Sequence, residues 1–112
     1  MDDIAEFAGL LKPGQRLLGL DLGTTTIGVA VSDVLRRIAS PVETIQRKKF
    51  TLDARRLMDI LTDQQAGGVV LGLPVNMDGT EGPRAQSSRS FARNMRQFTE
   101  LPFLLWDERL ST

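Results

Sequence analysis

The sequence predicts an α/β domain with a mixed five-stranded sheet and helices on both faces. Two apolar runs, 16–23 and 26–33, are separated by a gap too short for a helical crossover, so they should pair as an antiparallel hairpin. From residue 51 onward, segments with helical periodicity alternate with apolar runs, which is the order of parallel βαβ units. The length of 112 residues suits one compact domain.

The first half of the chain is predicted to form a helix and then three antiparallel strands. Residues 1–15 should be a helical extension packed on the domain that residues 16–112 form. Its apolar residues have helical spacing: Ile4, Phe7, Ala8 and Leu11. The hairpin continues into a third strand at 39–47, where apolar and polar residues alternate imperfectly.

The second half is predicted to add two helices and two strands. A helix at 51–65 is followed by a continuous apolar run at 68–74, which is typical of a central strand covered on both faces. A helix at 84–98 then leads to a last strand at 101–108. The apolar stripe expected for the first of these helices consists of Leu52, Leu57, Met58, Ile60 and Leu61.

Composition restricts the chemistry that the chain can use. Fourteen basic and fourteen acidic side chains cancel, so any site for a polyanion must be a local patch. The absence of cysteine and histidine excludes disulfides, thiolate zinc sites and imidazole-dependent catalysis, and it is compatible with the cytoplasm. The acidic N-terminus and the lack of a long apolar run predict no leader and no membrane segment.

Asp21 is a carboxylate in an apolar strand, between Leu20 and Leu22. An ionised group there is costly unless it is paired, hydrogen-bonded or bound to a cation. No Lys or Arg lies between residues 17 and 34, so a charged partner must come from elsewhere. Two interpretations remain open: the carboxylate accepts hydrogen bonds from the turn at 23–25, or it belongs to a functional site.

Asp107 and Glu108 end the last apolar strand much as Asp21 ends the first. The carboxyl ends of parallel strands gather at one edge of a sheet, which is a common place for a site. Successive strand residues face opposite sides, so one of the two acids should join Asp21 more readily than the other. Carboxylates gathered without histidine favour a hard cation such as Mg²⁺ or Mn²⁺, although a solvated strand end remains the alternative.

A polar loop, residues 75–83, should lie at the same edge. Asn76 and Thr80 offer neutral hydrogen bonds, and Arg84 opens a helix whose N-terminus attracts anions, so the loop is predicted to position a phosphate. The alternative is an ordinary polar turn. Two basic groups could extend a phosphate contact or simply be solvated. They are the arginines at 84, 89, 93 and 96, and the run Arg47-Lys48-Lys49.

Three motifs, "GLDLGTTTIGVAVSD", "GLPVNMDGTEGPRA" and "LLWDERLST", in this order resemble the YqgF/RuvX family. These are ribonuclease H-like proteins described as Holliday junction resolvases and implicated in trimming pre-16S rRNA. The resemblance covers residues 17–112. It implies a ribonuclease H-like sheet and metal-dependent hydrolysis of phosphodiester bonds in the bacterial cytoplasm.

The resemblance also implies roles for individual residues. Asp21 matches the family's first-strand aspartate, and Asp107-Glu108-Arg109 matches its DER motif. The implied catalytic residues are Asp21, Asp107 and Glu108, with Asp21 and Glu108 as ligands of Mg²⁺ or Mn²⁺. Arg84 and Arg109 would hold phosphate, beside Asn76 and Thr80 of the loop.

The chain departs from the family pattern in two places. Members commonly carry Lys-Arg where this chain has Thr25-Thr26, which removes two phosphate contacts from the turn. Members also continue beyond the DER-x-ST motif into a helix with a further catalytic aspartate, and this helix is expected to be missing from a chain that ends at Thr112.

The function predicted from these features is a nuclease that processes the 5′ end of pre-16S rRNA and works with ribosomal particles, as a monomer or homodimer. A Holliday junction resolvase acting on branched DNA is one alternative, and a catalytically silent RNA- or ribosome-binding module is another. The "LGLDLGTT" stretch is also similar to the phosphate loop of actin-like ATPases. Those proteins bind nucleotide between two such domains, so this interpretation is the least favoured.

Overall fold

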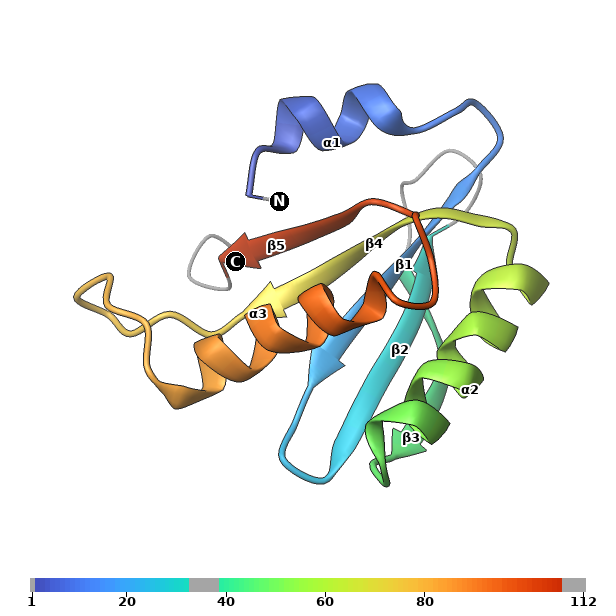
Figure 1. The fold of residues 1–112 in the computed structure, drawn as a ribbon. Coiled ribbons are helices and arrows are strands. Elements are labelled where there is room, and N and C mark those ends of the chain that lie inside the picture. Colours follow the sequence, from blue (N-terminus) through green and yellow to red (C-terminus); the bar gives the residue numbers. More distant parts are fainter. Residues whose placement is uncertain (1, 33–38, 108–112) are drawn as a thin grey trace.

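The computed structural model describes residues 2–32 and 39–107, which form one sheet with three helices around it (Figure 1). Every predicted helix and strand is present, with ends within a few residues of those expected. In chain order the elements are α1 (Ile4–Leu10), β1 (Arg16–Leu22), β2 (Thr26–Ser32), β3 (Ala39–Gln46), α2 (Phe50–Asp63), β4 (Ala66–Leu73), α3 (Pro83–Met95) and β5 (Phe103–Asp107).

The five strands pair in the order β3-β2-β1-β4-β5. The contacts of β2 with β1 and β3 are antiparallel, whereas β4 is parallel to both β1 and β5. The predicted meander followed by βαβαβ is therefore confirmed. The register aligns Leu20 of β1 with Leu71 of β4, and Leu71 with Leu105 of β5. Parallel strands β1, β4 and β5 thus end at the same edge of the sheet.

The helices α2 and α3 cover one face of the sheet and build the main core (Figure 1). Phe50 at the start of α2 packs edge-on against Phe91 and Phe98, with ring centroids 5.4 and 5.9 Å apart. The predicted position of Leu52 in the buried stripe is wrong, because this side chain is 49% exposed. The inward positions of the first turn belong instead to Phe50 and Asp53.

Asp53 is the one buried carboxylate among the described residues, with 4% exposure. Both of its oxygens accept from the backbone N–H of Lys48, at 3.1 and 3.3 Å. This contact satisfies an N–H just ahead of α2, whose N-cap residue, Lys49, makes no side-chain capping bond. Asp53 therefore has a structural role.

The short helix α1 packs on the opposite face and beside the edge strand β5 (Figure 1). A Cβ atom placed on Gly68 of β4 would lie 2.9 Å from side-chain atoms of both Phe7 and Leu11, so the helix sits directly over this glycine. The arm before α1 reaches round to α3, where Asp2 accepts from Arg89 at 3.2 Å. Helices therefore lie on both faces, as predicted, but α1 covers only one end of its face.

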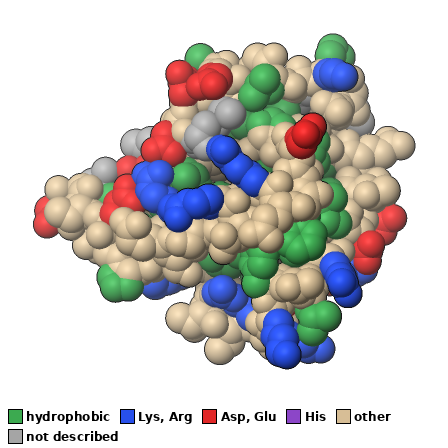
Figure 2. Space-filling view, viewed as in Figure 1, with side chains coloured by type: hydrophobic (Ala, Val, Ile, Leu, Met, Phe, Trp, Pro, Cys, Tyr) green, Lys and Arg blue, Asp and Glu red, His purple; other side chains and the backbone are tan. Residues whose placement is uncertain are grey.

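On the face shown in Figure 2, basic side chains lie beside acidic ones in some places and gather with other basic side chains at the lower end. Arg89 pairs with Glu81 and Asp2, and Arg56 pairs with Glu43. At the lower end of the view, near the start of α2, Lys and Arg gather without an acidic side chain among them. Among the described residues, no helix combines the length and apolar character needed to span a membrane.

Candidate active site

Asp21 lies on the open face of the sheet, in a row of residues that runs across all five strands. Its partner on β2 is Gly28, which in turn pairs with Thr44 of β3. Continuing the register of β1 and β4 by one residue places Gly72 on its other side, and Gly72 pairs with Trp106 of β5. Asp21 is therefore the one carboxylate in this row, with a glycine on each neighbouring strand.

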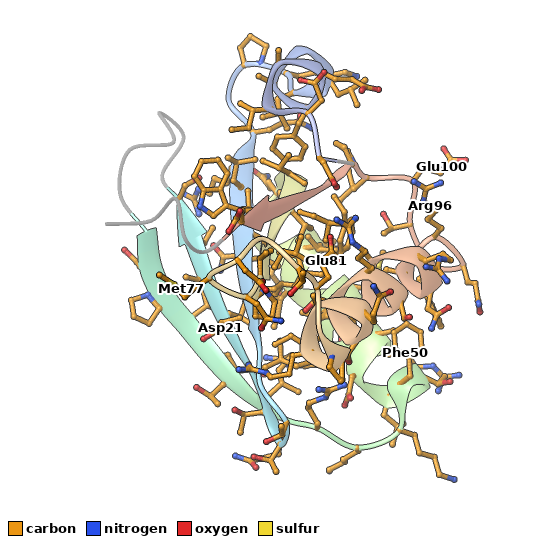
Figure 3. All side chains as sticks on the ribbon, turned by 90° about the vertical axis from the view of Figure 1, so that its left-hand side faces the viewer. Asp21, Phe50, Met77, Glu81, Arg96 and Glu100 are labelled. Atoms are coloured by element: carbon orange, nitrogen blue, oxygen red, sulfur yellow. The ribbon has the colours of Figure 1, made fainter. Side chains whose placement is uncertain are left out.

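The side chain of Asp21 is exposed and points away from α2 and α3, whose side of the sheet is marked by Phe50 in Figure 3. Within residues 2–32 and 39–107, its carboxylate takes part in no hydrogen bond or ion pair. The turn after β1 is closed instead by the N–H of Gly23, which donates to the carbonyl of Thr26 at 2.8 Å. The alternative in which Asp21 caps this turn is thus not what the structure shows.

A hollow of about 660 Å³ surrounds Asp21 on this face. Its floor consists of small residues, among them Gly19, Gly28, Ala30 and Gly72, and Trp106 forms one wall. Because these positions carry little or no side chain, a ligand can approach both the carboxylate and the backbone of β1 closely. Trp106 is half-buried and, through its pairing with Gly72, shares the face of Asp21.

Of the two other predicted acids, Asp107 lies within the described residues and Glu108 does not. Asp107 pairs with Leu73, so the alternation of side chains puts it on the opposite face from Asp21. Glu108 and Arg109 lie outside the described residues. The described part of the chain contains no group of three acidic side chains close enough to hold a metal ion. Asp21 is therefore the carboxylate around which a site can be built from the described residues.

The loop after β4 is a short hairpin whose polar side chains bond within it. The side-chain amide of Asn76 donates to the hydroxyl of Thr80 at 3.0 Å, and that hydroxyl donates to Asp78 at 2.6 Å. Glu81 accepts from Arg89 at 2.6 and 2.7 Å, and this contact lowers the pKa of Glu81 and raises that of Arg89. The loop thus has a defined shape, with Met77 exposed at its tip (Figure 3).

Two arginines contact the backbone immediately after Asp21. Arg84, in the first turn of α3, donates to the carbonyl of Leu22 at 3.3 Å. Arg47, just after β3, donates to the carbonyl of Gly23 at 2.5 Å. Arg84 was predicted as a site residue. Arg47 was not, although the basic run at 47–49 was the signal that could have found it.

The element order, the sheet topology and an exposed aspartate at the end of the central first strand together define a ribonuclease H-like domain. The solved structure of T. thermophilus RuvC in complex with a Holliday junction substrate has a TM-score of 0.58 at 14% identity, covering 85% of this chain and 66% of that one. The structure of Archaeoglobus fulgidus Pelota also has a TM-score of 0.58, at 10% identity, and the match covers 89% of this chain and 28% of the Pelota chain. At these identities the likeness shows the fold alone.

Sequence comparison identifies the family. The sequence model of RuvX, described as Holliday junction resolvase, matches residues 15–112. Relatives from Rhodopseudomonas palustris and Rhodobacter capsulatus, each named "Putative pre-16S rRNA nuclease", are both 62% identical. The matches cover 97% and 100% of this chain, and 67% and 69% of the relatives. The chain belongs to the RuvX family and is a nuclease that acts on nucleic acid.

Proposed function

We propose that this nuclease hydrolyses phosphodiester bonds in precursor 16S rRNA at a site built around Asp21. The observation that carries the proposal is the exposed Asp21 carboxylate, which has no partner in the described part of the chain and stands between two glycines. The choice of RNA is supported by the names of relatives that are 62% identical. As part of the same proposal, the chain acts on ribosomal particles and does so in the cytoplasm.

Asp21 is suited to bind a divalent cation, Mg²⁺ or Mn²⁺. Its two oxygens are exposed and have no hydrogen-bond donor among the described residues, and the flanking glycines leave room beside them. A hard cation prefers such oxygen ligands. When bound, it supplies charge stabilisation at the phosphate and activation of the attacking water. Glu108 is proposed as a second ligand.

The remaining residues would hold the substrate. Water attacks the phosphorus and the bond to the leaving oxygen breaks, so the phosphate gains negative charge that a nearby cation can stabilise. Arg84, beside the end of β1, is placed to bind that phosphate, and Arg109 is proposed for the same role. Asn76 and Thr80 keep the loop in shape and offer further neutral contacts at its surface.

Trp106 adds a means of holding a base. Its half-buried ring lines the hollow that contains Asp21, and aromatic rings bind unpaired bases by stacking. We propose that an unpaired nucleotide next to the cleaved bond lies against Trp106. The position of Asp107, on the other face of the sheet from Asp21, does not support the catalytic role predicted for it.

Cleavage of branched DNA is the second candidate, since the family description names Holliday junction resolution. To distinguish cleavage of RNA from cleavage of branched DNA, the chain is incubated with a precursor 16S rRNA fragment and with a four-way DNA junction, each with Mg²⁺ or Mn²⁺. We expect the RNA to be cut by the wild type. Asp21→Asn keeps the shape but weakens cation binding and should lower the rate by at least about 100-fold.

Equal cleavage by the wild type and Asp21→Asn would overturn the proposal that the catalytic site is built around Asp21. Cleavage of the junction alone would overturn the choice of RNA. Binding of RNA without cleavage under any of these conditions would instead support a module that binds RNA and does not cut it.

A further inference from the structure

We propose that Arg47 and Arg84 together form a phosphate-binding site at the turn between β1 and β2, in which Arg47 supplies a cation that the turn itself lacks. The inference rests on the proposed function, because it names the groups that would hold the nucleic acid beside Asp21. The two guanidinium groups come from different elements and donate to consecutive carbonyls, those of Gly23 and Leu22.

Among the described residues, no carboxylate neutralises the positive charges at this turn. Arg56 and Arg89 form ion pairs with carboxylates, but neither Arg47 nor Arg84 has an acidic partner in the segments 2–32 and 39–107. A guanidinium has five N–H donors, and each of these two arginines uses one of them on a neutral carbonyl. Within these two segments, the remaining donors and the charge of each guanidinium are left for an anion.

The turn also holds the arginine close to the proposed catalytic carboxylate. The backbone N–H of Arg47 donates to the carbonyl of Thr25 at 2.9 Å, so the chain at residue 47 is fixed to the turn as well as its side chain. Gly23 follows Asp21 by two residues, which is about 7 Å along an extended strand. A nucleic-acid strand that follows β1 from Asp21 toward the turn would come within reach of the Arg47 guanidinium.

A guanidinium and a phosphate are well matched in this position. The planar group can give two parallel hydrogen bonds to two phosphate oxygens, which a lysine ammonium cannot do. The turn residues Thr24, Thr25 and Thr26 carry no charge, so the segment after β3 is what makes the turn basic. Lys48 and Lys49 are exposed next to Arg47 and extend the same basic surface.

The test measures binding without cleavage. A short fluorescently labelled RNA is titrated with protein in EDTA, and its anisotropy is followed from about 50 mM to 200 mM salt. We expect Arg47→Gln to weaken binding about fivefold to tenfold at low salt and to reduce the slope of log K against log salt by about 0.7 to 1, the loss of one phosphate contact. Arg84→Gln should weaken binding and reduce the slope to a similar extent.

Two further variants control for folding and for total charge. Arg55→Gln removes one exposed positive charge from α2, where the proposal assigns no phosphate contact, and should leave the slope unchanged. Thr25→Lys, added to Arg47→Gln, returns a cation to the turn and should restore most of the slope. If Arg47 only holds the turn in place, Arg47→Gln would lower Tm without changing the slope, and Thr25→Lys would restore nothing; that result overturns the proposal.

The outcome is separable from that of the proposed function. If the chain binds RNA through Arg47 but cuts nothing with Mg²⁺ or Mn²⁺, the phosphate site stands and the nuclease site at Asp21 fails. If cleavage depends on Asp21 while Arg47→Gln binds RNA like the wild type, the nuclease site stands and the phosphate site fails. An equal loss of slope in Arg47→Gln and Arg55→Gln also counts against it, because it would show a general charge effect.

Discussion

At the scale of single residues, the space beside Asp21 depends on the side chains that its neighbours lack. A Cβ atom on Gly28 would lie 3.6 Å from the Cβ of Asp21, an ordinary van der Waals contact. The backbone therefore tolerates a larger residue at position 28, and stability alone does not require glycine there. The lack of a side chain is better explained by access to the carboxylate.

This explanation predicts different effects of one substitution on stability and on activity. Gly28→Ala should leave the free energy of unfolding unchanged or raise it by up to about 1 kcal/mol, since alanine restricts the unfolded chain more than glycine. It should lower the cleavage rate about tenfold, because the methyl group narrows the approach to Asp21. Urea unfolding and initial-rate measurements test the two parts.

Gly19→Ala is the matched control. It lies on the same face two residues before Asp21, and its Cβ would meet only the carbonyl of Ala30, at 3.9 Å. We expect a similar effect on stability and a much smaller effect on rate. If both variants cut RNA as fast as the wild type, close approach to Asp21 is not needed for the reaction.

At the scale of elements, local patterns predicted which segments form helices and strands, but the faces of some residues depend on how elements dock. In α2 the inward stripe runs through Phe50, Asp53, Leu57 and Ile60. The way the helix docks on the sheet leaves Leu52 outside this stripe and 49% exposed. The sequence did not predict a carboxylate on the buried stripe. The backbone N–H of Lys48, which Asp53 accepts from, comes within reach of Asp53 only through the path that the chain takes into the helix.

The same limit applies to the candidate site. Alternation predicted that Asp107 and Glu108 face opposite sides of the sheet, but only the register of β5 against β4 shows which side Asp107 takes. That register is set by the connection from α3 to β5, whose sequence carries no strong turn signal. Asp21 could be predicted as a candidate because it is a charged residue in an apolar strand. The position of Arg47 at the turn after Asp21 could not, because it depends on a hydrogen bond to the carbonyl of Gly23, in a turn far away in the sequence.

The loop between β4 and α3 gives a prediction that depends on pH. Hydrogen bonding to Arg89 lowers the pKa of Glu81, so this pair stabilises the fold above the ordinary glutamate pKa of about 4.3 and stops doing so as pH falls through the lower folded-state value. Glu81→Gln should therefore lower Tm near pH 7, by no more than a few degrees for a pair near the surface. The difference from wild type should shrink as the pH falls below this range and the carboxylate is protonated in the folded state.

Thermal unfolding followed by circular dichroism across this pH range measures the effect. Glu100→Gln is the control, because Glu100 is exposed and forms no ion pair among the described residues. A difference for Glu81→Gln that does not shrink as the pH falls would show that the ionised carboxylate is not what ties the loop to α3.

At the scale of the whole molecule, the N-terminal arm links parts that are far apart in the sequence. Asp2 joins Arg89 of α3, which also holds Glu81 of the loop, while Phe7 and Leu11 reach over Gly68 on the opposite face. The arm thereby passes the outer side of β5, an edge strand whose unpaired backbone groups would otherwise invite pairing with another chain. The family model matches residues 15–112, so α1 lies outside the matched segment.

If α1 docks through this contact, a methyl group on Gly68 should loosen it. The added Cβ would meet the side chains of both Phe7 and Leu11 at 2.9 Å, which is closer than atoms of this kind approach, so the helix must shift. Gly68→Ala should lower the free energy of unfolding by about 1 to 2 kcal/mol and speed hydrogen exchange of the amides at 5–10. Exchange in β1 and β4 and cleavage at Asp21 should stay near wild-type values.

Gly9→Ala gives the opposite expectation within the same helix. No atom lies within 4 Å of its added Cβ, and alanine favours helix over glycine by up to about 1 kcal/mol, so exchange in α1 should slow. Hydrogen exchange followed by mass spectrometry compares both variants with the wild type. Unchanged exchange at residues 5–10 in Gly68→Ala would show that α1 does not depend on its fit against the sheet. Faster exchange spreading into β1 would show that the arm supports the domain's core as well as its edge.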